Sequence, residues 1–149
     1  MKVRDIMDPS PDIIRTSDTF EHLIKILNEV KYHVVFVADK EEKLVGIVTE
    51  GDIIKVLIPK YVAVDESLIS VMDVNYFERK CRESKNLPIN EIMSKVTFMV
   101  GEEDPIIKAA ALMVMNKIQT IPVVRNGKVV GIVPRLTLIK HITKVLKGA

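Results

Sequence analysis

Thr49 and Asp52 stand three residues apart, just after an apolar run. Leu44–Val48 predicts a buried strand, and Gly51–Leu57 predicts a helix that follows it. The start of a helix exposes unpaired amides and the positive end of the helix dipole, so it attracts phosphate or another anion. A threonine hydroxyl adds a donor there, and a carboxylate one turn in can accept hydrogen bonds from both hydroxyls of a ribose. Because Gly46 lets the backbone approach closely, the spacing suits a nucleoside with a nearby phosphate.

The same two residues also fit a capping box, which is a purely structural arrangement. In a capping box, both side chains satisfy backbone amides at the start of their own helix. Taken by themselves, Thr49 and Asp52 favour this capping interpretation.

His33 is the third residue with a candidate chemical role. Its ring could stack on a base or donate to a phosphate, and its charge changes near neutral pH; equally, it could anchor a loop. Three histidines and one cysteine without clustered spacing predict no metal site. There is no nucleophile motif, Walker loop, Gly-x-Gly-x-x-Gly or paired catalytic carboxylates, so the sequence does not predict an enzyme.

The elements that must position these residues belong to an internal repeat, whose two copies are 86 residues apart. Three segments recur in order: Asp5–Met7 as Glu91–Met93, Tyr32–Val37 as Ile118–Val123 and, after one deleted residue, Lys43–Val48 as Lys128–Val133. The first copy covers residues 2–57 and the second covers residues 88–146. Each copy is too small to bury its apolar face well alone, so we expect the two to pack together.

Each copy predicts the order strand, helix, strand, strand, helix. In the first copy, Asp18 and Glu21 have the spacing of a helix start, and Val34–Ala38 reads as a buried strand. In the second copy, Asp104-Pro105 predicts a helix start with proline at the first position. Asn126-Gly127 predicts a hairpin turn. Arg135–Leu146 is the closing helix.

Residues 58–87 separate the copies and have no counterpart in either. Leu68, Val71, Met72 and Phe77 suggest a helix there, and Tyr76–Asn86 is charged. The simplest interpretation is a tethering helical linker. The alternative is a lid, or a contact with a partner or a second subunit.

Composition excludes several classes of function. The formal net charge of +2 gives no basic footprint for a nucleic acid, and no apolar run is long enough to span a membrane. The first residues contain no signal-peptide pattern, and the single cysteine cannot form an internal disulfide. We therefore expect a cytoplasmic protein that binds neither nucleic acid nor membrane.

The ordered motifs resemble the CBS domain family. The resemblance is carried by the repeated Ile-Met, by Thr120–Val124 and by Gly46–Asp52, and it covers nearly the whole chain except residues 58–87. A tandem pair of such domains is called a Bateman module. The resemblance implies an α+β fold of two pseudo-symmetric halves packed through their sheets, and a homodimer shaped as a flat disc. It also implies clefts that bind AMP, ADP, ATP, S-adenosylmethionine or NAD.

By resemblance, the base of the ligand lies between the two halves. The residues expected around it, besides Thr49, Asp52 and Gly46, are His33 and Val34 on one side, Ile118 and Gln119 on the other, Ile47 as the floor, and Val96 and Thr97 as the opposite wall. No basic residue adjoins His33, so a monophosphate or nucleoside is favoured over a triphosphate. Inside two such repeats, the interpretation of Thr49 and Asp52 shifts from capping to ligand binding.

The second cleft departs from the pattern. Pro134 stands where Thr49 stands, and Thr137 stands where Asp52 stands. Proline has no donor, and threonine cannot make a charged contact with two hydroxyls. The second, weaker cleft is assigned Thr137, Arg135, Ile132 and Thr120, with Arg135 adding phosphate affinity.

Two functions follow from these assignments. The first is a regulatory module, with no obligatory cofactor, that senses an adenosine-containing metabolite and acts on a separate, unknown protein. The alternative is a structural module that dimerises or docks a partner while its clefts stay empty.

Overall fold

The first repeat forms a three-stranded sheet flanked by two helices. The computed structural model describes residues 1–148, apart from the side chain of Ala63. The elements are β1 (Ile13–Arg15), α1 (Phe20–Leu27), β2 (Val34–Ala38), β3 (Leu44–Thr49) and α2 (Glu50–Leu57). β1 pairs parallel with β2, and β2 pairs antiparallel with β3. The predicted order is therefore confirmed, although Thr19, and not Asp18, caps α1.

The second repeat keeps the helices and the hairpin but has a reduced first strand. Its elements are α4 (Ile106–Asn116), β4 (Thr120–Arg125), β5 (Lys128–Pro134) and α5 (Arg135–Leu146). Where the first repeat has β1, the second makes a single parallel bridge between Val100 and Val123. Pro105 is the N-cap of α4 and not its first residue. The predicted Asn126-Gly127 turn is present, and both residues have positive φ values of 54° and 81°.

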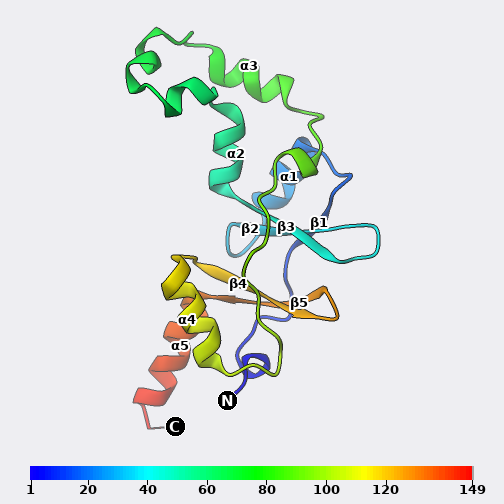
Figure 1. The fold of residues 1–149 in the computed structure, drawn as a ribbon, viewed down its shortest axis with the longest axis vertical. Helices are drawn as coiled ribbons and strands as arrows, with labels where there is room; N and C mark the ends of the chain where they lie inside the picture. Colours follow the sequence, from blue (N-terminus) through cyan, green and yellow to red (C-terminus); the bar gives the residue numbers. More distant parts are fainter. Residues whose placement is uncertain (149) are drawn as a thin grey trace.

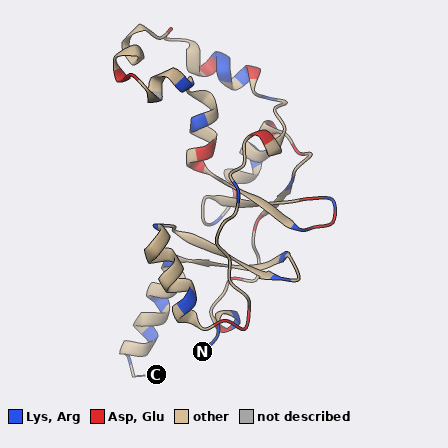
Figure 2. Ribbon diagram, in the orientation of Figure 1, with Lys and Arg blue, Asp and Glu red and all other residues tan. Residues whose placement is uncertain are grey.

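The insert between the repeats is helical but broken. It contains two 3-10 segments, η2 (Lys60–Ala63) and η3 (Glu66–Val71), followed by α3 (Tyr76–Glu83). The single helix suggested by Leu68 to Phe77 is interrupted after Val71. The insert projects from one end of the molecule, and α4 and α5 lie at the other (Figure 1). Acidic and basic residues are mixed along α3, whereas α5 carries only basic ones (Figure 2).

The leading segment of each repeat packs on the other repeat. Ahead of β1, the segment with η1 (Val3–Asp5) bonds through Asp8 to Ile132 of β5. The segment with η4 (Ile89–Glu91) bonds in the same way through Ser94 to Ile47 of β3. The two repeats therefore exchange equivalent segments.

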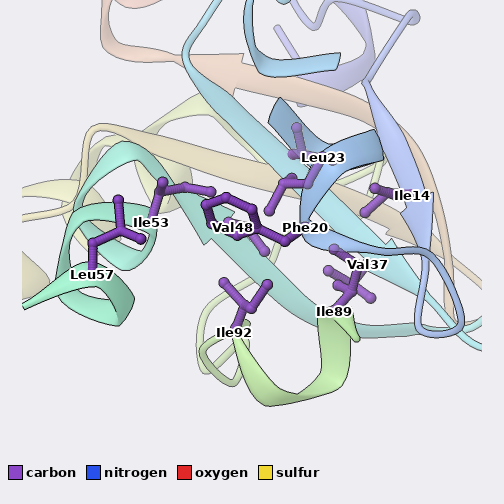
Figure 3. Close-up of a cluster of buried hydrophobic side chains, with 10 residues drawn as sticks. Ile14, Phe20, Leu23, Val37, Val48, Ile53, Leu57, Ile89 and Ile92 are labelled. Carbon is purple, nitrogen blue, oxygen red and sulfur yellow. The ribbon is translucent and has the colours of Figure 1, made fainter. Parts of the chain in front are cut away.

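This exchange completes both apolar cores. Ile89 and Ile92, from the second leading segment, pack with Ile14, Phe20 and Leu23 of the first repeat (Figure 3). Likewise, the first leading segment contributes Val3 to the core of the second repeat. Neither repeat fills its interior with its own residues alone.

The two sheets meet through a third apolar cluster. Val34 and Phe36 of β2 pack with Ile132 of β5, and all three are at most 4% exposed. The Leu44 amide also donates to the Gly127 carbonyl across the junction, at 2.9 Å. The predicted α+β fold of two repeats packed through their sheets is therefore confirmed. Within residues 1–148, no helix has the length and apolarity needed to cross a bilayer.

Candidate functional site

Thr49 and Asp52 meet at the junction of β3 and α2. Thr49 is the N-cap of α2, and its hydroxyl accepts a hydrogen bond from the Asp52 amide at 3.4 Å. Oδ2 of Asp52 accepts from the Thr49 amide at 2.9 Å and from the Thr49 hydroxyl at 3.2 Å. Both contacts of a capping box are thus present, and one carboxylate oxygen remains for another partner.

That second oxygen joins the helix start to the other repeat. The Ser94 hydroxyl donates to Oδ1 of Asp52 at 2.8 Å. Ser94 is held there because its amide and carbonyl both bond to the backbone of Ile47, each at 2.9 Å. The contact therefore links α2 to the leading segment of the second repeat.

Ser94 is a site residue that the sequence analysis missed. A signal for it exists, because Ser94 directly follows the repeated Ile92-Met93, and Asp8 holds the matching place after Ile6-Met7. The strands opposite these positions are also matched, since Asp8 bonds to Ile132 as Ser94 bonds to Ile47. Alignment of the two repeats would have drawn attention to both residues.

His33 lies beside the same helix start. Its backbone is left-handed, with φ of 58°, and its Nδ1 is 3.5 Å from Oε2 of Glu50, the first residue of α2. Both side chains are largely exposed. The structure thus brings His33 close to Thr49 on an open surface, where the ring is accessible.

Three other predicted residues lie inside the packing between the repeats. A Cβ added at Gly46 would collide with the side chain of Met93, so this glycine accommodates the exchanged segment. Val34 is only 4% exposed, and Ile47 is half-buried against the same apolar cluster. The close approach at Gly46 is therefore made by Met93.

The residues expected on the other side of the base and on the opposite wall are spread over two regions. Ile118 and Gln119 line a groove between α4 and α5, and the Gln119 carbonyl accepts from the Arg135 amide at 2.9 Å. Val96 is half-buried and Thr97 is exposed, in the segment of irregular backbone that follows Ser94.

An open pocket of about 650 Å³ adjoins Asp52. It lies between α2, α3 and the second leading segment, and Asp52 and Ser94 line it together with Lys55 and Lys80. Ile118, Gln119, Val96 and Thr97 do not line this pocket. The insert is thus close to the predicted ribose carboxylate, which is where the lid considered as an alternative for residues 58–87 would lie.

The second cleft is built differently. Pro134 caps α5 without a side-chain hydrogen bond. Thr137 lines a small cavity of about 240 Å³, whereas Arg135 lies in the α4–α5 groove. Ile132 is 2% exposed, and Thr120 is half-buried opposite Pro134. The four assigned residues are therefore divided between the groove, the small cavity and the interior.

Asp8 provides a carboxylate near this second junction. The Tyr32 hydroxyl donates to Oδ2 of Asp8 at 2.7 Å, and Lys31 Nζ lies 3.7 Å away. The Tyr32 hydrogen bond holds the pKa of Asp8 below its usual value and raises the pKa of Tyr32. Burial raises the pKa of nearby Asp12. At the first junction the carboxylate is on the helix (Asp52), and the leading segment supplies a hydroxyl (Ser94). At the second junction the helix supplies a hydroxyl (Thr137), and the carboxylate is on the leading segment (Asp8).

The chemistry that this arrangement offers is binding by hydrogen bonds. The first junction combines a carboxylate, two hydroxyls and an accessible imidazole, a set suited to hydroxyl-bearing ligands. Within residues 1–148, no group of three or more His, Cys, Asp and Glu side chains is arranged to hold a metal ion.

Comparison with known proteins identifies both repeats. The model of the CBS domain matches residues 3–59 and residues 89–144. Protein MJ1004 of Methanocaldococcus jannaschii is 30% identical over 148 residues, and the chain spans 58% of its length. The crystal structure of MJ1004 superimposes with a TM-score of 0.73 over 97% of this chain and 60% of that chain.

Two further solved structures contain adenosine compounds. The CBS domain pair of MJ0100, in complex with 5′-methylthioadenosine and S-adenosyl-L-methionine, has a TM-score of 0.70 at 25% identity and covers 95% of this chain and 99% of that chain. CBSX2 of Arabidopsis thaliana, in complex with AMP, has a TM-score of 0.71 and covers 97% of each chain. Its identity of 22% shows a shared fold. Because the two matched segments account for most of its residues, this chain belongs to the CBS domain family as a tandem pair.

Proposed function

We propose that this protein is a regulatory module that binds an adenosine-containing metabolite at the junction of β3 and α2. The observation that carries the proposal is the Asp52 carboxylate, which lies at a helix start and also touches the other repeat through Ser94. A ligand held by Asp52 therefore acts at a point where the two repeats meet.

Binding at this junction requires an exchange of hydrogen bonds. Asp52 is half-buried, and its two oxygens are occupied by Thr49 and Ser94. A ribose with paired hydroxyls replaces these neutral donors with two of its own, while the amides at the start of α2 favour a nearby phosphate. His33, exposed beside Glu50, provides an aromatic surface for the base or a donor for the phosphate.

The adenosine class is supported by two relatives. MJ0100 has been solved with 5′-methylthioadenosine and S-adenosyl-L-methionine, and CBSX2 with AMP. For this chain we propose a monophosphate or nucleoside-like ligand, because neither neighbour of His33 in the sequence is a lysine or an arginine. Lys31, two residues before His33, is exposed.

The regulatory output follows from the exchange of bonds. Ser94 loses a carboxylate partner when the ligand binds, so the ligand changes the contact between α2 and the second leading segment. A partner protein senses this change only to the extent that the ligand prefers one arrangement of the repeats. We propose a homodimer as the assembled form, and a role in binding and not in catalysis.

A structural role is the second candidate. It is favoured by one observation, the apolar groove of about 670 Å³ between α4 and α5, which is open to a protein partner. In that case the module would dock a partner while the junction at Asp52 serves only to cap its helix.

Titration of adenosine compounds separates the two functions. Melting of the full chain is followed with AMP, S-adenosylmethionine and 5′-methylthioadenosine, with cytidine monophosphate as the control. A ligand present at a hundredfold excess over its Kd stabilises the folded state by about 2.7 kcal/mol. The proposal fails if no adenosine compound raises the melting temperature more than the cytidine control does.

A further inference from the structure

The open pocket beside Asp52 owes much of its size to the insert. We call it the insert pocket; it lies between α2, α3 and the second leading segment, and its volume is about 650 Å³. The equivalent hollow between α5 and the first leading segment is lined by no insert residue and measures about 240 Å³. Thr137 and Asp5 stand in that hollow where Asp52 and Glu91 stand in the insert pocket. The insert thus gives one of two matched hollows the size of a small-molecule site, which is about 300–1,000 Å³.

The insert wall of this pocket is fixed to the first repeat. Just after α3, the Leu87 carbonyl accepts from the Phe20 amide at 2.8 Å, and the Lys85 carbonyl accepts from the Glu21 amide at 3.1 Å. Cys81 and Leu87 also pack against the core of the first repeat. The wall is therefore already formed, so a ligand need not order it on binding.

Ser84 places a buried hydroxyl in the same wall. It is 5% exposed, it is the one buried polar residue among residues 1–148, and it lines the insert pocket. Its hydroxyl makes no hydrogen bond to another described residue, and none of the described side chains has a polar atom sealed from solvent without a partner. Because Ser84 lines the insert pocket, a ligand there can supply the missing bond.

The insert pocket carries both signs of charge in equal number. Three lysines and three carboxylates line it: Lys55, Lys60, Lys80, Asp52, Glu83 and Glu91. Within the part of the chain that the structure describes, no ion pair joins one of these lysines to a carboxylate. Glu83 has one long contact, with Arg79 Nε at 4.0 Å, and Asp52 is bonded to Thr49 and Ser94. The lining therefore keeps opposite charges apart, which suits a ligand that carries both and not a simple anion or cation.

Apolar side chains complete the lining. They come from α2, from both ends of the insert and from the second leading segment: Val56, Ile58, Pro59, Leu87, Ile92 and Met93. A complementary ligand combines an ammonium, a carboxylate and an apolar stem. An α-amino acid with an apolar side chain has these three parts.

We propose that the insert pocket binds a zwitterionic amino-acid group. Lys80 is half-buried and lies one helical turn before Ser84, so their side chains can bond the carboxylate together. Glu91, on the second leading segment, bonds the ammonium. The group is either a free amino acid or the end of a nucleoside ligand. In the second case the inference rests on the proposed function, because Asp52 would hold the ribose at the edge of this pocket.

Two thioethers separate the amino-acid end from the nucleoside. S-adenosylhomocysteine and 5′-methylthioadenosine share adenosine and an uncharged sulfur, and only the first has the amino-acid group. Free methionine is the third probe. Isothermal titration of the full chain measures each Kd for the wild type and for Lys80→Met with Glu91→Gln, which leaves the net charge unchanged. The matched control is Lys40→Met with Glu41→Gln, in the exposed turn between β2 and β3.

The expected result depends on the source of the group. If it belongs to a nucleoside, the wild type and the control should bind S-adenosylhomocysteine at least about tenfold more tightly than 5′-methylthioadenosine, because charge-assisted bonds are added. The Lys80 and Glu91 variant should bind the two alike, with its affinity for 5′-methylthioadenosine and its melting temperature unchanged. If the group is free, methionine should bind the wild type and the control, and should bind this variant at least about tenfold more weakly.

Two outcomes would overturn the proposal. In the first, the wild type binds S-adenosylhomocysteine no more tightly than 5′-methylthioadenosine and does not bind methionine. In the second, the Lys80 and Glu91 variant keeps the wild-type affinities for S-adenosylhomocysteine and methionine, which would place the amino-acid group elsewhere. Failure of both nucleosides to bind contradicts the proposed function instead, and methionine that binds the wild type but not the variant would then still support the insert pocket.

Discussion

Replacing Asp52 with alanine removes the bonds that join the start of α2 to two neighbours. The loss of the capping-box contact with Thr49 costs about 1 kcal/mol. The loss of the Ser94 bond costs about 1 kcal/mol more, because the half-buried site remains accessible to water. We therefore expect Asp52→Ala to lower the free energy of unfolding by about 2 kcal/mol, which corresponds to about 4–8 °C in melting temperature for a chain of this length.

Urea unfolding followed by circular dichroism measures this change, with Ser94→Ala as the companion variant. Ser94→Ala removes the bond between the repeats and leaves the capping contacts of Asp52 in place, so about half of the loss is expected. The reasoning would be refuted if Asp52→Ala changed the free energy of unfolding by less than about 0.5 kcal/mol, the range of neutral surface substitutions.

The same pair of variants separates capping from ligand binding. If Asp52 holds a ribose, Asp52→Ala weakens AMP by about 1.5–3 kcal/mol, whereas Ser94→Ala frees the carboxylate and leaves affinity equal or higher. Isothermal titration gives both values at a temperature where the variants are folded. Equal affinity of wild type and Asp52→Ala would show that the carboxylate serves only its helix.

Two further predictions concern the exchanged segments and their surroundings. Tyr32→Phe should destabilise the fold by about 1–2 kcal/mol at pH 7. The folded-state pKa of Asp8 lies below the ordinary 3.8, so the stabilisation by this hydrogen bond is present above pH 3.8 and is lost as the pH falls through the folded-state pKa. Urea unfolding of the wild type and Tyr32→Phe at pH 7 and pH 3 measures this loss. An equal effect of the substitution at both pH values would contradict the prediction. Gly131→Ala should cost about 1–3 kcal/mol, because its Cβ would lie 3.0 Å from the backbone carbonyl oxygen of Asp8 as well as 2.6 Å from Met7 Sδ. Gly51→Ala is the control: its Cβ has no contact closer than 3.6 Å, so the helix should gain about 0.5–1 kcal/mol, and a loss of stability there would count against the packing argument.

Local patterns were sufficient to predict most of the elements. The apolar run Val34–Ala38 forms β2, and Arg135–Leu146 forms α5 with the expected bounds. Asn126-Gly127 forms the predicted turn, which connects β4 to β5. Each of these signals depends on neighbours in the sequence. The first strand of the second repeat was predicted and is reduced to the bridge at Val100, since the strength of a short strand depends on its partners.

The candidate site was harder to predict, because it depends on contacts between distant segments. Thr49 and Asp52 were found from their spacing, but the partner of Asp52 comes from a leading segment that packs on the other repeat. The positions of Ile118 and Gln119 beside α5 depend on how α4 and α5 pack. The sequence pattern left a tethering linker and a lid as alternatives for the insert and did not predict which of its residues line the pocket next to Asp52.

The exchange of leading segments also constrains how such a protein could arise. A solitary copy of the unit would lack Ile89 and Ile92 beneath its first helix and would leave its own Val3 with no interior to enter. Two identical solitary copies could complete their cores by exchanging leading segments, and duplication of the gene would join such a pair into one polypeptide. Because each copy fills part of the other's core, we expect that cutting the chain between the copies would leave two fragments that remain associated.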